Sequence, residues 1–218
     1  MNTLNRKSFA PATALALGLF SALTMSAAHA DVVFDNGAPT TMNGYGIGGS
    51  GSNGSTADDF SIAAGATIHS VGFYFQNYNG VSGWDQQVSY NIFSDAGNQP
   101  GAMMAGGSAQ NVTAVQSAFN WCCGGKAWLV EFDLASDFVA DAGTTYWLQL
   151  TGAGGPSPWW VSADAGNGVV GSSGSWYSTG LNFAFTLSTP SDGTVPEPTS
   201  LLLTGGALAA LGWARRKA

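Results

Sequence analysis

Residues 128–134 read Trp-Leu-Val-Glu-Phe-Asp-Leu, and every second residue from Trp128 onward is apolar. Successive side chains of a β-strand point to opposite faces, so the apolar residues share one face and Glu131 and Asp133 share the other. This alternation predicts a strand that is buried on one side only.

Four other stretches alternate in the same way. Their apolar residues are Val71, Phe73 and Phe75; Val88, Tyr90 and Ile92; Tyr146, Leu148 and Leu150; and Leu181, Phe183, Phe185 and Leu187. Shorter strands are expected at 32–34, 59–62 and 160–162. Glycine- and asparagine-rich turns separate the strands, and residues with high helix propensity are scarce. The chain is therefore predicted to form an all-β, antiparallel β-sandwich, with jelly-roll and immunoglobulin-like topologies both open.

The N-terminus has the three parts of a secretion signal. Arg6 and Lys7 precede an apolar run over 12–23, and Ala28-His29-Ala30 is an Ala-x-Ala cleavage site. This order predicts a signal peptide over residues 1–30, which is handled by the general secretion machinery and removed by signal peptidase.

The C-terminus repeats the combination of cations and an apolar run. Pro196, Glu197 and Pro198 precede an apolar stretch over 199–214, and Arg215-Arg216-Lys217 follows it. A helix of that length reaches about 24 Å, slightly less than a bilayer core, so it predicts a short transmembrane helix that anchors only marginally. Cations beside such a segment stay in the cytoplasm.

Pro196, Glu197 and Pro198, the short apolar helix, and Arg215 with Arg216 together resemble the PEP-CTERM sorting signal of Gram-negative bacteria. The resemblance implies transient inner-membrane anchoring, processing by an exosortase, and a host that makes exopolysaccharide. More weakly, the segments 57–60, 68–75 and 90–95 resemble the β-sandwich ectodomains that are joined to this tail. The predicted organisation is a signal peptide (1–30), a β-sandwich ectodomain (31–188), a linker with the Pro-Glu-Pro motif (189–198), and a transmembrane helix with a basic tail (199–218).

The predicted mature segment, residues 31–195, is strongly acidic. It holds twelve of the thirteen acidic residues and one basic residue, Lys126, for a net charge of −11. Nucleic acid is excluded as a partner, because phosphate neutralisation requires Lys and Arg. The carboxylates keep an extracellular protein soluble, or some of them bind Ca²⁺; solubility is favoured. If Ca²⁺ binds, Asp58, Asp59 and Asp95 are the expected ligands, and no other cofactor is expected.

The cysteines and histidines offer little catalytic chemistry. Cys122 and Cys123 are adjacent and the secretory route is oxidising, so they are predicted to form a disulfide that locks a turn; intermolecular disulfides and free thiols remain alternatives. His69 is the one histidine left after removal of the signal peptide, and it is predicted to be a solvent-facing strand residue.

Two sets of residues remain as candidate sites. Glu131 and Asp133 share a strand face with Cβ atoms about 6.5–7 Å apart, a spacing compatible with an acid–base pair and equally with a solvated face. Trp147 is out of parity with its neighbours, and one of Trp159 and Trp160 must point outward. The remaining glycan-stacking candidates, Trp176 and Tyr177, are predicted to lie in a Gly/Ser-rich loop.

The sequence as a whole predicts a non-enzymatic, exported protein of the cell surface or medium. Its expected role is a structural or adhesive component of an exopolysaccharide or biofilm matrix. A carbohydrate-binding module that uses Trp159 or Trp160 with Trp176 and Tyr177 is the first alternative. A polysaccharide-active enzyme that uses Glu131 and Asp133 is the second alternative.

Overall fold

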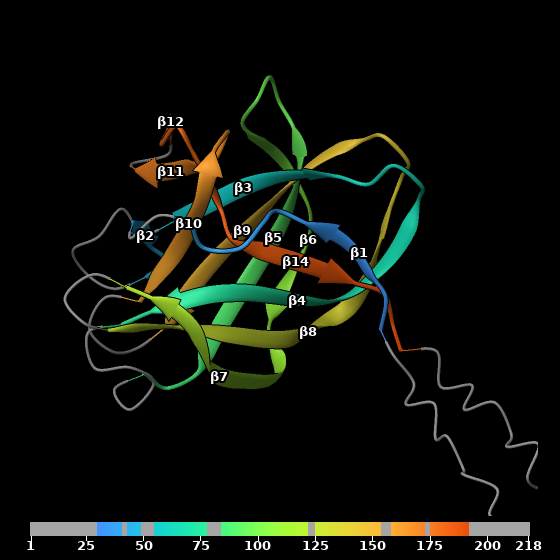
Figure 1. Cartoon of the computed structure of the whole chain (residues 1–218). Coiled ribbons are helices and arrows are strands. Elements are labelled where there is room, and N and C mark those ends of the chain that lie inside the picture. Colours follow the sequence, from blue (N-terminus) through green and yellow to red (C-terminus); the bar gives the residue numbers. More distant parts are fainter. Residues whose placement is uncertain are drawn as a thin grey trace, which may run out of the picture. The chain divides into compact units, whose positions relative to one another are not determined.

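The computed structural model describes residues 30–40, 43–48, 55–77, 84–121, 125–153, 158–172 and 175–191. Only β-strands and their connections occur there, in agreement with the predicted fold class (Figure 1). No helix in these ranges is long and apolar enough to cross a membrane. The predicted signal peptide, the transmembrane helix, the Pro-Glu-Pro motif and the cysteines at 122 and 123 lie outside the described residues.

The first sheet has eight strands. They are β1 (Val32–Asp35), β2 (Gly44–Gly46), β4 (Ala66–Gln76), β7 (Gln110–Asn120), β8 (Lys126–Ala140), β10 (Trp159–Ala165), β13 (Leu181–Phe183) and β14 (Phe185–Ser188). Strand β4 is central, because it pairs with β8 along one edge and with β14 and β10 along the other. Strand β7 continues the sheet beyond β8, and β1 continues it beyond β14.

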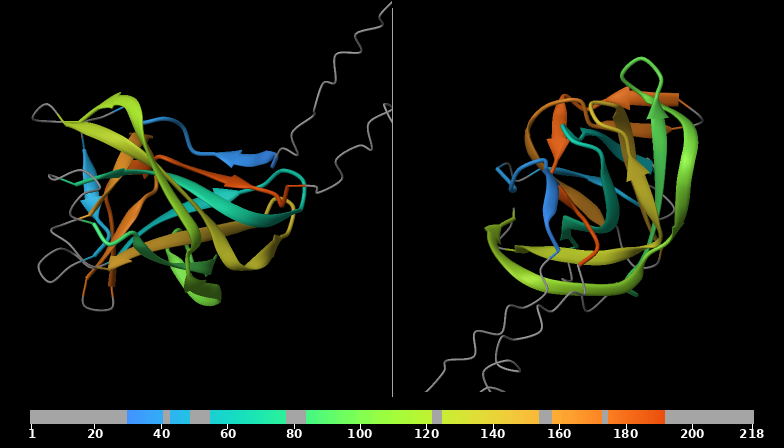
Figure 2. Two further views of the ribbon diagram at one scale, coloured as in Figure 1. Left: turned by 90° about the horizontal axis from the view of Figure 1, so that it is seen from below. Right: turned by 90° about the vertical axis from the view of Figure 1, so that its right-hand side faces the viewer.

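The second sheet has six strands in the order β12, β11, β3, β9, β5, β6. Their bounds are β3 (Ser55–Ser61), β5 (Gln87–Asp95), β6 (Pro100–Ser108), β9 (Thr145–Ala153), β11 (Val169–Ser172) and β12 (Ser175–Ser178). Both sheets are antiparallel throughout, which confirms the predicted antiparallel sandwich; Figure 2 shows the strands from two further directions.

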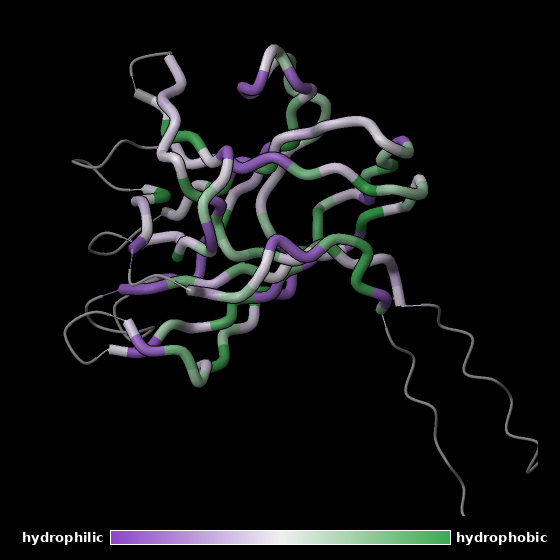
Figure 3. Tube along the Cα trace, turned by 45° about the horizontal axis from the view of Figure 1, so that its top comes forward, coloured by the Kyte–Doolittle hydropathy of each residue, from purple (hydrophilic) through white to green (hydrophobic). Residues whose placement is uncertain are grey.

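The core forms where the two sheets face each other, and strand parity decides which residues enter it. Val130, Phe132 and Leu134 are buried, as the alternation predicts, whereas Trp128 at the start of that strand is only half-buried. The other predicted inward residues are also buried, except Leu181, which is half-buried. The alternation of hydrophilic and hydrophobic residues along the strands is visible in Figure 3. Tyr90 spans the two sheets, because its hydroxyl accepts a hydrogen bond from the Ala135 amide at 3.0 Å.

The first and last strands of the sandwich are neighbours. Val32 of β1 is paired with Ser188 of β14, and the Thr189 amide donates to the Asp31 carbonyl at 2.9 Å. The two ends of the described domain therefore lie side by side (Figure 1).

Candidate functional site

Asp58 on β3 is a buried carboxyl group inside the sandwich. Its side chain is inaccessible to solvent and accepts hydrogen bonds from the Phe183 amide, from the Asn36 side-chain amide at 2.7 Å and from the Asp59 amide at 3.0 Å. Burial raises the pKa of Asp58 to about 8, an effect that these hydrogen bonds oppose and that the neighbouring Asp59 carboxylate adds to. Because Phe183 belongs to the other sheet, Asp58 is a structural tether between the sheets.

The outer face of the six-stranded sheet carries a second apolar cluster, which we call the outer aromatic cluster. Trp147, Ala57 and Val169 are its buried members, and Phe93 and Trp176 pack against them while half-exposed. Trp147 thus lies on the outer face, as its parity predicts, yet it is fully buried because the cluster covers it. Its indole Nε1 donates to Asp95 Oδ1 at 2.8 Å, which fixes the ring.

Trp176 and Tyr177 lie on the edge strand β12, so the prediction of a loop at these residues is wrong. Trp176 reaches the outer aromatic cluster by lying over a glycine. It is paired in register with Gly171 of β11, and a Cβ atom at position 171 would lie 3.1 Å from the Trp176 ring. Gly171 therefore leaves room for the indole to approach the backbone closely. Tyr177, the next residue, is 57% exposed and points to the opposite side of β12.

Amide and hydroxyl groups surround the cluster on the same face. The Asn91 side-chain amide donates to Gln149 Oε1 at 2.7 Å across β5 and β9. Small hydroxyl residues follow along these strands: Ser89 is paired with Ser108 on one side and with Thr151 on the other, and Ser55 is paired with Gly171. Aromatic rings beside amides and hydroxyls are suited to a ligand that has both apolar faces and many hydroxyl groups.

The outer face of the eight-stranded sheet holds a third cluster. Trp121 and Trp159 meet edge to face at 6.5 Å, and Tyr74 and Phe119 meet edge to face at 5.4 Å. Burial, with the nearby carboxylates of Asp35 and Glu131, raises the pKa of Tyr74 above its usual value. The Trp159 Nε1 is buried and has no hydrogen-bond partner.

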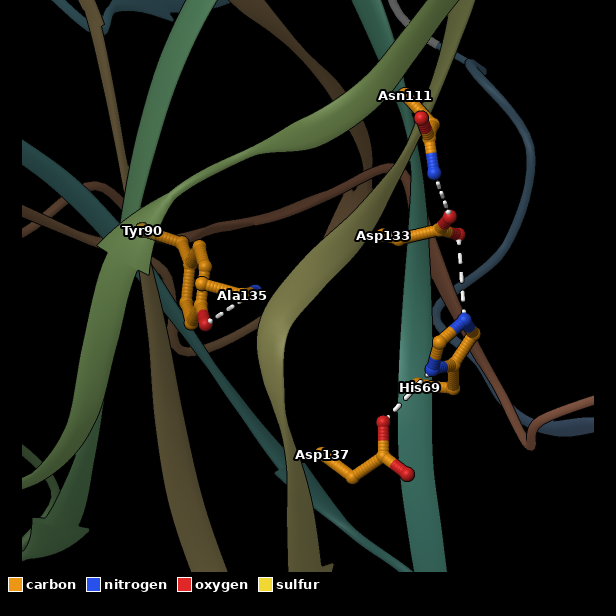
Figure 4. A network of polar contacts seen from close by, with 6 residues as sticks. All are labelled: His69, Tyr90, Asn111, Asp133, Ala135 and Asp137. Atoms are coloured by element: carbon orange, nitrogen blue, oxygen red, sulfur yellow. Dashed lines mark hydrogen bonds and ion pairs between the residues drawn. The ribbon is translucent and has the colours of Figure 1, made fainter.

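His69 takes part in a polar network on this outer face (Figure 4). Its Nδ1 lies 2.7 Å from Asp137 Oδ1, and its Nε2 lies 3.6 Å from Asp133 Oδ1. The Asn111 side-chain amide donates to the other oxygen of Asp133 at 2.8 Å. The network joins β4, β7 and β8, and His69 lies half-exposed on its strand.

The predicted glycan-stacking residues are distributed over three places. Trp160 is in the core, Trp159 belongs to the cluster on the eight-stranded sheet, and Trp176 belongs to the outer aromatic cluster. Trp176 and Tyr177 point to opposite faces of β12, so the structure does not bring the four residues together as one surface. Phe93, Asn91 and Gln149 are outer-face residues near Trp147 that sequence reasoning missed: Phe93 is paired in register with Trp147, and Asn91 with Gln149. Their parity, opposite to Ile92 and Leu148, is the signal that could have placed them on the outer face.

The other predicted site residues lie as follows. Glu131 is exposed on the outer face of β8, and Asp133 on the same face is held by Asn111 and His69. Asp95 accepts hydrogen bonds from the Gly97 and Asn98 amides of its own turn. Asp58, Asp59 and Asp95 do not form a cluster: no group of three or more acidic, histidine or cysteine side chains in the described ranges is arranged to hold a metal ion. Calcium binding stays a prediction.

Residues 194–217 match the family model of the PEP-CTERM protein-sorting motif. The chain therefore carries this sorting motif, which implies export, transient sorting at the membrane and processing by an exosortase. No curated protein and no solved structure matches the chain.

Proposed function

We propose that the exported sandwich is a non-catalytic, adhesive component of an extracellular polysaccharide matrix. It holds glycan chains on the outer face of the six-stranded sheet. The observation that carries this proposal is the half-exposed Trp176 ring, which lies over Gly171 and packs on the outer aromatic cluster. Phe93 and the Asn91–Gln149 amide pair lie farther along the same face of the sheet. A sugar ring offers an apolar face to the indole and hydroxyl groups to the amides, so one ligand satisfies both kinds of group.

The charge of the domain selects among glycans. Asp59 lies half-buried on this face, Asp95 bounds it, and the mature segment has a net charge of −11. Like charges across an interface oppose association, so a polyanionic polysaccharide is disfavoured. The proposed ligand is a neutral polysaccharide.

Replacing Trp176 by alanine should weaken binding of neutral exopolysaccharide by about tenfold or more, because the stacking ring is lost. The measurement is a quantitative pull-down, on exopolysaccharide from the producing strain, of protein isolated from cells that express the full chain. Tyr177→Ala on the same strand and Trp159→Ala on the other sheet are matched controls that should bind as the unchanged protein does. Equal losses in Trp176→Ala and Tyr177→Ala, or no binding by the unchanged protein, would contradict the proposal.

Processing of the sorting motif makes a separate prediction. The mature protein at the surface or in the medium should lack residues 201–218, because an exosortase cleaves near the Pro-Glu-Pro motif. Mass spectrometry of intact surface and medium protein measures this directly. If most of the mature material still contains Trp213 and Arg216, the chain is anchored without processing.

A further inference from the structure

The sheet edges of the described domain differ greatly in length. Strands β1 and β12 have four residues each, and β2 and β13 have three each. In contrast, β6 has nine residues and β7 has eleven, and only Ala109 separates them in the chain. In the part of the chain that the structure describes, β6 pairs only with β5 and β7 only with β8. A short edge strand offers an incoming strand few unpaired backbone groups, whereas the long strands β6 and β7 offer many.

The long edges also lack the charged residues that usually protect an edge strand. No charged side chain occurs between Asp95 and Lys126, a segment that contains both strands. Met103, Met104 and Val115 lie within it and are 64%, 57% and 63% exposed. Natural proteins commonly place Lys or other charges on exposed edges to prevent pairing with another chain. The edge formed by β6 and β7 is therefore open to strand addition.

Local geometry favours β7 over β6. Strand β6 begins with Pro100, which has no amide hydrogen, and a bulge at Met104 interrupts its register between Ile92 and Phe93 of β5. Strand β7 has register shifts towards both of its ends, but it keeps a regular register over Thr113–Gln116 in the middle and contains no proline. Near its end, the Lys126 ammonium of the paired strand β8 donates hydrogen bonds to the Ala118 carbonyl at 3.2 Å and to Asn120 Oδ1 at 2.6 Å.

We propose that β7 pairs antiparallel with β7 of a second copy of this chain and joins the two eight-stranded sheets. Antiparallel pairing of identical strands is two-fold symmetric and closes as a dimer. Val115 is the central residue of β7, so a centred pairing places it beside Val115 of the second copy. Each copy has a predicted mature net charge of −11, and β7 itself carries none of it, so pairing along β7 brings no charged side chains of the two β7 strands together.

Sedimentation of protein isolated from cells that express the full chain tests the association. The unchanged protein should form a concentration-dependent dimer. Val115→Lys should weaken the dimer by about tenfold or more, because two ammonium groups would then face each other. Val139, on β8, is 67% exposed, so Val139→Lys is a matched control and should leave the dimer unchanged. A monomer at every concentration, or equal dimers from Val115→Lys and the unchanged protein, would overturn the proposal.

Two further measurements test the pairing mode. Under oxidation, Val115→Cys should give a disulfide-linked dimer on a non-reducing gel. The unchanged protein and Val139→Cys, which report on the native cysteines, should give none. Amide hydrogen exchange should slow in β7 as concentration rises, while β12, the opposite edge of the other sheet, should not change. If dimers form but the rate of amide hydrogen exchange in β7 stays the same, the backbone of β7 is not hydrogen-bonded to the second copy. That result would overturn the proposed strand pairing.

Discussion

Replacing Asp58 by alanine should lower the free energy of unfolding by about 3–5 kcal/mol. The carboxyl group is fully buried and accepts hydrogen bonds from the Phe183 amide, the Asn36 side chain and the Asp59 amide. Alanine leaves these donors without their acceptor and leaves a gap between the two sheets. Equilibrium unfolding in urea, followed by tryptophan fluorescence, measures the loss.

Two variants separate the tether from the charge. Asp58→Asn keeps an oxygen for Phe183 and Asn36, so it should be clearly more stable than Asp58→Ala. Asp59→Ala changes the adjacent, half-buried carboxylate and should cost much less. If Asp58→Ala is as stable as Asp59→Ala, the buried hydrogen bonds do not hold the sheets together.

The pH dependence of the unchanged protein provides a further check on Asp58. Its carboxyl group titrates at about 8 in the folded state and at 3.8 as a model group, so the folded protein holds the extra proton between these values. The contribution of Asp58 to the free energy of unfolding is therefore full below pH 3.8 and is lost as pH rises to about 8. Asp58→Asn, which has no proton to lose, should show a flatter pH profile over this range.

Replacing Trp160 by alanine should also cost about 3–5 kcal/mol, since a large core side chain is removed. The indole is inaccessible to solvent and stacks on Phe183 with ring centroids 5.0 Å apart. It also contacts Phe73 and Phe185 edge to face, and its Nε1 donates to the Ala184 carbonyl at 3.1 Å. Thermal or urea unfolding measures the change.

Trp159→Ala is the natural comparison, because the same residue type is removed one position away. Trp159 is half-buried on the outer face and its Nε1 forms no hydrogen bond, so its loss should cost clearly less. Equal destabilisation by the two variants would mean that the outer cluster supports the fold as strongly as the core does.

Strand parity made much of this architecture predictable. Alternation identified the inward faces of β4, β5, β8 and β9, and it required Trp159 and Trp160 to face opposite ways. It could not tell which of the two faced inward, because that depends on the pairing of β10 with β4. The alternation also predicted that Trp147 lies on the outer face. It did not predict that the ring is buried there, because the residues that cover it come from four other strands, β3, β5, β11 and β12.

Asp58 shows where sequence reasoning reached its limit. Adjacent aspartates near a strand end suggested calcium ligands, but the donors that satisfy Asp58 are Asn36 and Phe183, which are distant in sequence. Only the folded arrangement of three strands brings them together. The same holds for the outer face, where Asn91 and Gln149 meet because β5 and β9 are neighbours.

The position of the last strand has a consequence for the order of folding during export. β14 lies between β1 and β4, so the eight-stranded sheet has an empty place until residues 185–188 are available. A chain that crosses a membrane with its N-terminus first delivers these residues last. Contacts between such distant segments also form slowly, because a long loop must close first. A domain exported in this direction completes its eight-stranded sheet only after residues 185–188 have crossed, shortly before the sorting motif, which begins six residues later at 194.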